Sequence, residues 1–292
     1  MRTRLVDALI AASNEPGTAL APAALVIARI EYPNVDTARY VAELDRMGDD
    51  ARRRIDAVLE ESGEHSTKAR LGALAAYLYE DRRFVGNRTH YEDPRNSCLN
   101  EVIDRRTGIP ITLALVYMEV AQRVGLEVEG VNFPGHFLVR CLDRETPGHS
   151  GQIVDPFNAG ALLSERECRL LLRQQVGGNV PFSRSLLAAA SRRDILVRML
   201  LNLKRIYVHM RSFPQAHEVT GLLLALNPSA LSELRDRGLL AFHLNDVGGA
   251  LSDLQSYLRL AGLTGVDKKT REEHAQIWEH VKTLRRRMAS LN

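Results

Sequence analysis

Hydrophobic residues recur at helical spacing through the first quarter of the chain. Between residues 5 and 81 this spacing predicts consecutive helices, for example at 23–30 and 67–80. A polar stretch at 86–97 is rich in Asn, Asp, Pro and Gly, residue types that suit tight turns. The chain is therefore expected to begin with packed helices and to continue into an ordered loop.

The pattern after this loop predicts two helices followed by short strands. A short helix is expected at 98–105, with Gly108 placed to end it. Pro110 begins a second helix, because a proline in the first turn leaves no N–H unpaired, and this helix is apolar on nearly all sides. After Gly125 the hydrophobic period changes to two, which is typical of strands. The predicted strands are 128–132, 136–141 and 152–155, the last two forming an antiparallel hairpin.

The remaining third of the chain is helical and contains an internal repeat. Ala216 and Ala250 lie 34 residues apart, which is the period of a tetratricopeptide helix pair. The match is incomplete, since Lys204 stands where the first repeat would carry a glycine. An amphipathic helix at 269–288 can cover the exposed end of the repeats. A Gly- and Pro-containing stretch at 177–181 marks the boundary between two parts. The expected domains are residues 1–180 and 188–292.

The composition argues against several classes of protein. The chain has 292 residues with 39 Lys and Arg against 36 Asp and Glu, and a net charge of +3 argues against a protein that wraps nucleic acid. The three cysteines form no Cys-x-x-Cys pair, which argues against a disulfide framework and a structural zinc site. No uncharged apolar run reaches the roughly 18 residues that a membrane span requires. We therefore expect a cytoplasmic protein without a cofactor, bound neither to nucleic acid nor to a membrane.

Three residues of the predicted helix and hairpin could together support nucleophilic catalysis. Cys98, His136 and Asp155 follow the order nucleophile, base and orienting carboxylate, and the last two are expected on adjacent strands. A thiol at a helix N-terminus is stabilised as the thiolate by the helix dipole. Alternatively, Cys98 is a small buried hydrophobic residue and His136 is a turn residue after Pro-Gly. The residues alone leave both interpretations open.

Six segments carry a family resemblance. They are NSCLNEVI at 96–103, GIPITL at 108–113, PGHFLVR at 134–140, DPF at 155–157, RMLLNLK at 198–204 and RDRGLL at 235–240. Through them the chain resembles the bacterial SirB-type family, over about residues 24–260. The resemblance implies an α+β fold with a transglutaminase-like (papain-like) core and a helical N-terminal extension. An all-α domain of tetratricopeptide-like helical hairpins is expected to follow.

The same resemblance implies where a catalytic triad would lie. Active transglutaminase-like proteins place a nucleophilic cysteine near the start of the central helix, and here Pro110 occupies that position. His136 and Asp155 match the other two triad positions, so the site resembles a triad that has lost its thiol. Our first hypothesis is therefore a non-catalytic module for protein interaction or regulation. The alternative is a cysteine amidohydrolase, protease or transglutaminase that uses Cys98 with His136 and Asp155.

Further polar residues suggest binding rather than catalysis. Asn96 and Asn100 could hydrogen-bond a bound amide, although Asn96 is also placed to cap a helix. No metal site is expected, because His90, Asp93 and His136 lack helical ligand spacing. In the repeats, basic residues of successive first helices are expected to line one concave, positive groove. They are Arg198, Arg205, His209, Arg235 and His243. Such a groove would bind an acidic protein or peptide, or dock onto the first domain of the same chain.

Overall fold

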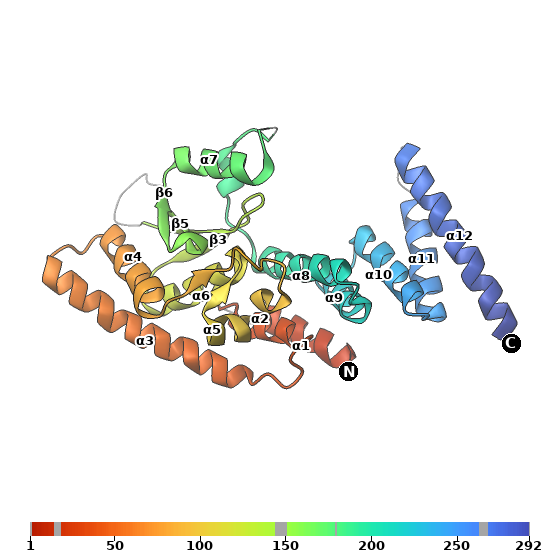
Figure 1. Ribbon diagram of the computed structural model, residues 1–292, viewed down its shortest axis with the longest axis horizontal. Helices are drawn as coiled ribbons and strands as arrows, with labels where there is room; N and C mark the ends of the chain where they lie inside the picture. The colour runs from red at the N-terminus through yellow and green to blue at the C-terminus, as the bar shows by residue number, and fades with distance from the viewer. Residues whose placement is uncertain (1, 15–18, 144–150, 179, 263–267, 292) are drawn as a thin grey trace. The chain divides into compact units, whose positions relative to one another are not determined.

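The computed structural model describes residues 2–14, 19–143, 151–178, 180–262 and 268–291 (Figure 1). Its contacts divide the chain into two compact units. The larger unit comprises Ala11–Met199, and the helical unit comprises Met1–Ile10 together with Leu200–Asn292. The divisions between the two units fall within α1 (Arg2–Asn14) and within α8 (Arg192–His209) of the chain. The boundary expected between residues 180 and 188 stays a prediction.

The larger unit combines helices with short strands, as expected for an α+β core. Its elements before the central helix are α2 (Ala21–Ala28), α3 (Thr37–Ser62), α4 (Thr67–Ala75), η1 (Ala76–Asp81), β1 (Val85–Gly86), η2 (Pro94–Ser97), α5 (Leu99–Arg105) and β2 (Thr107–Gly108). Those that follow are α6 (Pro110–Arg123), β3 (Val128–Val131), β4 (Leu138–Cys141), β5 (Gln152–Asp155), η3 (Pro156–Asn158), β6 (Ala161–Leu163), α7 (Glu165–Val176) and η4 (Arg184–Leu187). The helical content of the first 81 residues agrees with the sequence pattern.

Helix α6 forms the centre of the larger unit. It begins at Pro110 as predicted, and its residues are buried from Pro110 through Ala121. Thr112 fixes its first turn, because the Thr112 hydroxyl accepts from the Ile109 N–H at 3.1 Å and donates to the Asn96 carbonyl at 2.7 Å. The helix packs against α3 on one side and against β3 and β4 on another (Figure 1). An all-round apolar helix is stable only in such a position.

The sheet is an antiparallel meander in the order β3-β4-β5-β6. The predicted hairpin is present, with Val139 opposite Val154. The expected strand at 136–141 is shorter than predicted, because the chain is still in the turn at Gly135, which has a φ of 70°, and β4 begins only at Leu138. His136 therefore lies in the turn before β4. Strand β6 was not predicted, since its three residues are too few to show a period.

The predicted helix at 67–80 changes character near its end. The α-helical part α4 ends at Ala75, and residues Ala76–Asp81 form the π-helical turn η1. The wider turn buries two consecutive residues, Tyr77 and Leu78. Hydrophobic spacing alone does not distinguish such a turn from a regular helix end.

The helical unit consists of antiparallel helix pairs, which confirms the repeat. Its helices after α8 are α9 (Phe213–Leu226), α10 (Leu231–His243), α11 (Val247–Ala261) and α12 (Lys268–Leu291). Ala216 and Ala250, the equivalent positions of the two repeats, are fully buried in α9 and α11. Lys204 of α8 binds Glu233 and Asp236 of α10 at 2.7 and 2.8 Å. The lysine that replaces the template glycine thus links the first helices of both repeats.

Candidate functional site

The structure brings His136 and Asp155 into direct contact. His136 Nε2 lies 2.9 Å from Asp155 Oδ1, and the two residues are only 4% and 1% exposed. His136 comes from the turn before β4, whereas Asp155 is the last residue of β5. The adjacent strands β4 and β5 therefore position the pair. Since a carboxylate accepts, the contact places a proton on Nε2.

Asp155 is held by more than the imidazole. Its carboxylate also accepts from the backbone N–H groups of Phe157 and Asn158, at 3.1 and 3.3 Å, and from Asn158 Nδ2 at 2.6 Å. Burial would raise the pKa of Asp155, but the hydrogen bonds from His136 and Asn158 outweigh it and hold this pKa below its usual range. The carboxylate is therefore ionised at neutral pH and orients His136.

An aromatic ring covers this pair. The Phe157 ring meets the His136 ring edge-on, with centroids 5.8 Å apart, and the Arg88 guanidinium lies 5.0 Å from the Phe157 centroid. Arg88 also donates to the Asn158 side chain. A pocket of about 340 Å³ lies beside them. Its lining residues are Tyr79, Phe84, Val85, Gly86, Arg88, Phe157, Asn158 and Ala159. Phe157 thus connects the pocket to the buried pair.

The sequence did not indicate a functional role for Arg88 or Phe157, which line this pocket. Arg88 and Phe157 come from the polar loop and from η3, and neither carries a catalytic signature of its own. The Asp155-Pro156 dipeptide was the available signal, because Asp before Pro is typical of a turn that the aspartate caps. A turn there places Phe157 and Asn158 directly after the carboxylate.

Cys98 has the environment of a structural cysteine. It is 1% exposed at the N-terminus of α5. Burial raises the pKa of its thiol to about 12, and the nearby acids Glu31, Glu101 and Asp93 raise it further. A helix N-terminus would lower this pKa, but here burial and like charge prevail. Within the described ranges, no hydrogen bond joins Cys98 Sγ to the His136 ring.

The other two cysteines are also buried thiols. Cys141 and Cys168 are free and buried, and burial raises the pKa of each thiol to about 11. Pro110, at the position implied for the nucleophile, is buried in the first turn of α6. Its ring offers no atom that can attack an acyl group.

Asn96 does not cap a helix, which corrects the interpretation of this residue as a cap: the N-cap residues of η2 and α5 are Asp93 and Cys98. It is fully buried inside the polar loop, where its Nδ2 donates to the His90 carbonyl at 2.8 Å and its Oδ1 accepts from Asn87 at 3.2 Å. Loop closure uses its hydrogen-bonding groups, and this leaves little for a ligand. Asn100 is also buried, and its Oδ1 has no hydrogen-bond partner among the described residues.

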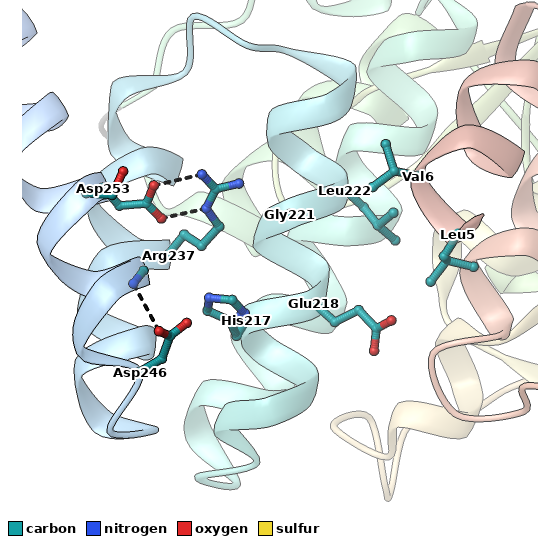
Figure 2. Close-up of a pocket in the computed structure, with 11 residues that line it drawn as sticks. Leu5, Val6, His217, Glu218, Gly221, Leu222, Arg237, Asp246 and Asp253 are labelled. Atoms are coloured by element: carbon teal, nitrogen blue, oxygen red, sulfur yellow. Dashed lines mark hydrogen bonds and ion pairs between the residues drawn. The ribbon is translucent and has the colours of Figure 1, made fainter. Parts of the chain in front are cut away.

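The basic residues expected in one groove have separate surroundings. Arg198 donates to Asn132 at 2.9 Å, Arg235 Nε donates to Asp236 at 2.8 Å, and the His243 ring stacks on Phe213 with centroids 4.9 Å apart. Arg205 and His209 are exposed on α8. None of these five basic residues lines the pocket of the helical unit in Figure 2. The expectation of one positive groove on the concave face of the repeats stays a prediction.

Two negative findings apply to the described part of the chain. It contains no group of three or more His, Cys, Asp or Glu residues arranged to hold a metal ion. None of its helices is both long enough and apolar enough to cross a membrane.

Comparisons with known proteins agree with this architecture. Residues 38–201 match the transglutaminase-like superfamily, and residues 203–286 match the tetratricopeptide repeat. A UPF0162 protein of Xylella fastidiosa is 39% identical over 241 residues, which cover 81% of this chain and 82% of the relative. The UPF0162 protein YchA of Escherichia coli is 27% identical over 230 residues, covering 79% of this chain and 81% of YchA.

A eukaryotic protein shares part of this similarity. Human F-box only protein 21 is 34% identical over 184 residues, which cover 60% of this chain but 28% of that protein. The match to the Xylella protein extends over most of both chains. Along the sequence, the helical pairs follow the transglutaminase-like core, in the same order as the two family matches. The chain therefore belongs to the UPF0162 family, within the transglutaminase-like superfamily.

Proposed function

We propose that this protein is a non-catalytic transglutaminase-like protein that acts as a protein-interaction or regulatory module. The observation that carries the proposal is a buried His136–Asp155 pair without a thiol partner in the described structure. Acyl transfer by this fold needs a covalent thioester, and a histidine with a carboxylate supplies general-base help of only about 10²- to 10⁴-fold. The pair then serves to hold the turn before β4 against the end of β5.

Alkylation of individual cysteines tests this proposal. The full chain is treated with iodoacetamide at several pH values, and the labelling rate of each cysteine is measured by peptide mass spectrometry. We expect Cys98 to react no faster than an unactivated thiol with a pKa of about 8.5. Cys141 and Cys168 serve as internal references, because burial also raises their pKa values.

The competing proposal is a cysteine amidohydrolase, protease or transglutaminase in which Cys98 attacks and His136 takes its proton. It requires the thiol to reach the imidazole. Rapid, pH-insensitive labelling of Cys98 that disappears in His136→Ala would support this enzyme and overturn the non-catalytic proposal. The acids beside Cys98 favour the opposite result.

The tetratricopeptide region is the part proposed to bind a protein partner, since stacked helical repeats offer extended surfaces. An acidic partner and docking onto the larger unit are two forms of this proposal, and both depend on the basic residues of α8 and α10. Arg235→Glu in the full chain tests both, because reversal of this charge should reduce cross-links between the units if they dock.

The proposal also includes the SirB-type assignment and a cytoplasmic location, which three free cysteines favour.

A further inference from the structure

The helical unit contains a pocket of about 420 Å³ whose chemistry the repeat pattern did not predict. Figure 2 shows α9 as its floor, with α1 on one side and α10 and α11 on the other. Leu5 and Val6 of α1 face Leu222 and make one side apolar. The opposite side is polar, and its charged residues are Arg237, Asp246 and Asp253. A volume of this size accommodates a side chain or a small ligand.

The positive charge in the lining is already neutralised. Arg237 Nε donates to Asp253 Oδ2 at 2.6 Å, and Arg237 Nη2 donates to Asp253 Oδ1 at 2.8 Å. Such a two-point pair fixes both side chains and satisfies both charges. The hydrogen bonds that Arg237 donates to Asp253 hold the pKa of Arg237 above its already high ordinary value. Arg237 therefore remains charged and paired with Asp253.

Two carboxylates of the lining have no such cation. Glu218 of α9 and Asp246 at the start of α11 form no ion pair with a lysine or arginine in the described ranges. Asp246 is oriented by the Gly249 N–H, which donates to its Oδ1 at 2.9 Å. Figure 2 shows Asp246 and Glu218 on opposite sides of α9, with the ring of His217, a further lining residue, drawn between them. The lining is therefore net negative, which favours a cationic occupant.

Gly221 keeps the centre of the floor open. It lies within α9, and a Cβ built on it would meet no atom within 4 Å. A glycine inside a helix costs about 0.5–1 kcal/mol relative to alanine, so helix stability does not explain it. Without a side chain at this position, the pocket stays open one turn of α9 after His217 and Glu218.

We propose that this pocket binds the cationic side chain of a partner protein, an arginine or lysine in an exposed segment. The methylene stem of such a side chain would pack against Leu5, Val6 and Leu222, and its charged head would pair with Glu218 and Asp246. The inference rests on the proposed function, because both require the helical unit to bind a partner. It assigns the opposite charge to that partner from the one expected at the sequence level.

A matched pair of peptides tests the charge requirement. The probe is an acetylated, amidated pentapeptide with a central arginine between alanines and glycines, and the control replaces arginine by citrulline, which has nearly the same shape but no charge. Binding to the full chain is followed by ligand-observed NMR titration. We expect the arginine peptide to bind about ten-fold or more tightly than the citrulline peptide. Equal affinities, or no binding of the arginine peptide up to about 10 mM, would overturn the proposal.

Variants of the lining test the location. Glu218→Gln combined with Asp246→Asn removes both charges, while the asparagine keeps an acceptor for the Gly249 N–H. Gly221→Leu fills the open floor. Each should weaken arginine-peptide binding about ten-fold, whereas Glu272→Gln, at an exposed position of α12 outside the lining, should leave it unchanged. Thermal melts check that each variant stays folded.

The outcomes also separate this inference from the proposed function. If the lining variants bind the arginine peptide as well as the unaltered chain does, this pocket is not the site, and the thiol labelling result stands by itself. If Cys98 instead labels rapidly, the non-catalytic proposal fails while the peptide affinities still decide the pocket. The two measurements share neither a residue nor a readout.

Discussion

Glu119 and Leu20 lie 99 residues apart and are joined by a hydrogen bond in which the Leu20 N–H donates to Glu119 Oε1 over 2.5 Å. The same oxygen accepts from the Ala21 N–H at 2.7 Å. Helix α2 is almost entirely buried, so the N–H groups of its first turn, which have no partner within the helix, cannot form hydrogen bonds with water. A carboxylate from the central helix α6 satisfies them, and its charge suits the positive end of the α2 dipole.

Removal of this carboxylate should strongly destabilise the larger unit. Glu119 is 1% exposed, and its second oxygen accepts from Arg123 Nη1 at 2.7 Å. Glu119→Ala leaves two buried N–H groups without their acceptor and removes one of the two carboxylates that pair with Arg123, which keeps Asp45, so we expect a loss of about 3 kcal/mol in the free energy of unfolding. Urea denaturation measures it. Glu60→Ala, at an exposed position of α3, is the control and should change stability by less than about 0.5 kcal/mol.

The contrast between Glu119 and Pro110 shows what the sequence could predict. Pro110 begins α6 through a local effect of the proline ring, and the repeat of Ala216 and Ala250 reflects local helical packing. Both were predicted from neighbouring residues. The partner of Glu119 is chosen by tertiary packing across 99 residues, and no local pattern specifies it.

In the candidate site, too, the features that depend on local sequence were predicted and those that depend on tertiary packing were not. The His136–Asp155 contact follows from the pairing of two predicted strands, whereas Asn96 was misread because its partners depend on how the whole loop closes. The covering ring of Phe157 also depends on tertiary structure, because it meets His136 only after η3 turns back. The charge of the pocket in Figure 2 depends on which arginine already has a partner.

A double-mutant cycle on His136 and Asp155 should reveal coupling. Asp155→Ala removes the acceptor of a buried hydrogen bond, so we expect it to destabilise the protein by roughly 1 to 3 kcal/mol. His136→Ala should cost a comparable amount. If the residues stabilise each other, the loss in the double variant is smaller than the sum of the single losses. Thermal melts measure all four proteins, and strictly additive losses would mean that the side chains do not interact.

The stability should also depend on pH through Asp155. Its pKa in the folded protein is lower than in the unfolded chain, where it is about 3.9. The carboxylate therefore contributes its stability fully above about pH 4, and this contribution is lost as pH falls through the lower folded pKa. Urea denaturation between about pH 2.5 and 7 should show the loss in the unaltered protein. Asp155→Asn has no group to titrate there, and its profile should be flatter; parallel profiles would contradict the assignment.

Lys204 provides a test within the helical unit. Its ammonium group binds Glu233 and Asp236, and Glu233 is a buried residue. Lys204→Met keeps the length of the stem but leaves Glu233 without its cation, while Arg235 still pairs with Asp236, so we expect a loss of about 2 kcal/mol. Lys204→Gly, which introduces the glycine of the repeat template, should lower the stability further because a glycine also destabilises helix α8. Lys282→Met, which breaks an exposed pair with Glu279, should cost less than about 1 kcal/mol.

Gly86 and Gly72 differ in whether the structure has room for a side chain at their positions. A Cβ on Gly86 of β1 would lie 2.6 Å from the Phe157 ring, whereas a Cβ on Gly72 of α4 would meet nothing within 4 Å. Gly86→Ala should therefore displace the ring that covers His136 and destabilise the protein by about 1 to 3 kcal/mol. Gly72→Ala should instead stabilise it by about 0.5 to 1 kcal/mol, because alanine favours a helix interior. Urea denaturation gives both values, and the chemical shifts of the His136 ring report the displacement. A Gly86→Ala variant with unchanged shifts and stability would contradict the contact between β1 and Phe157.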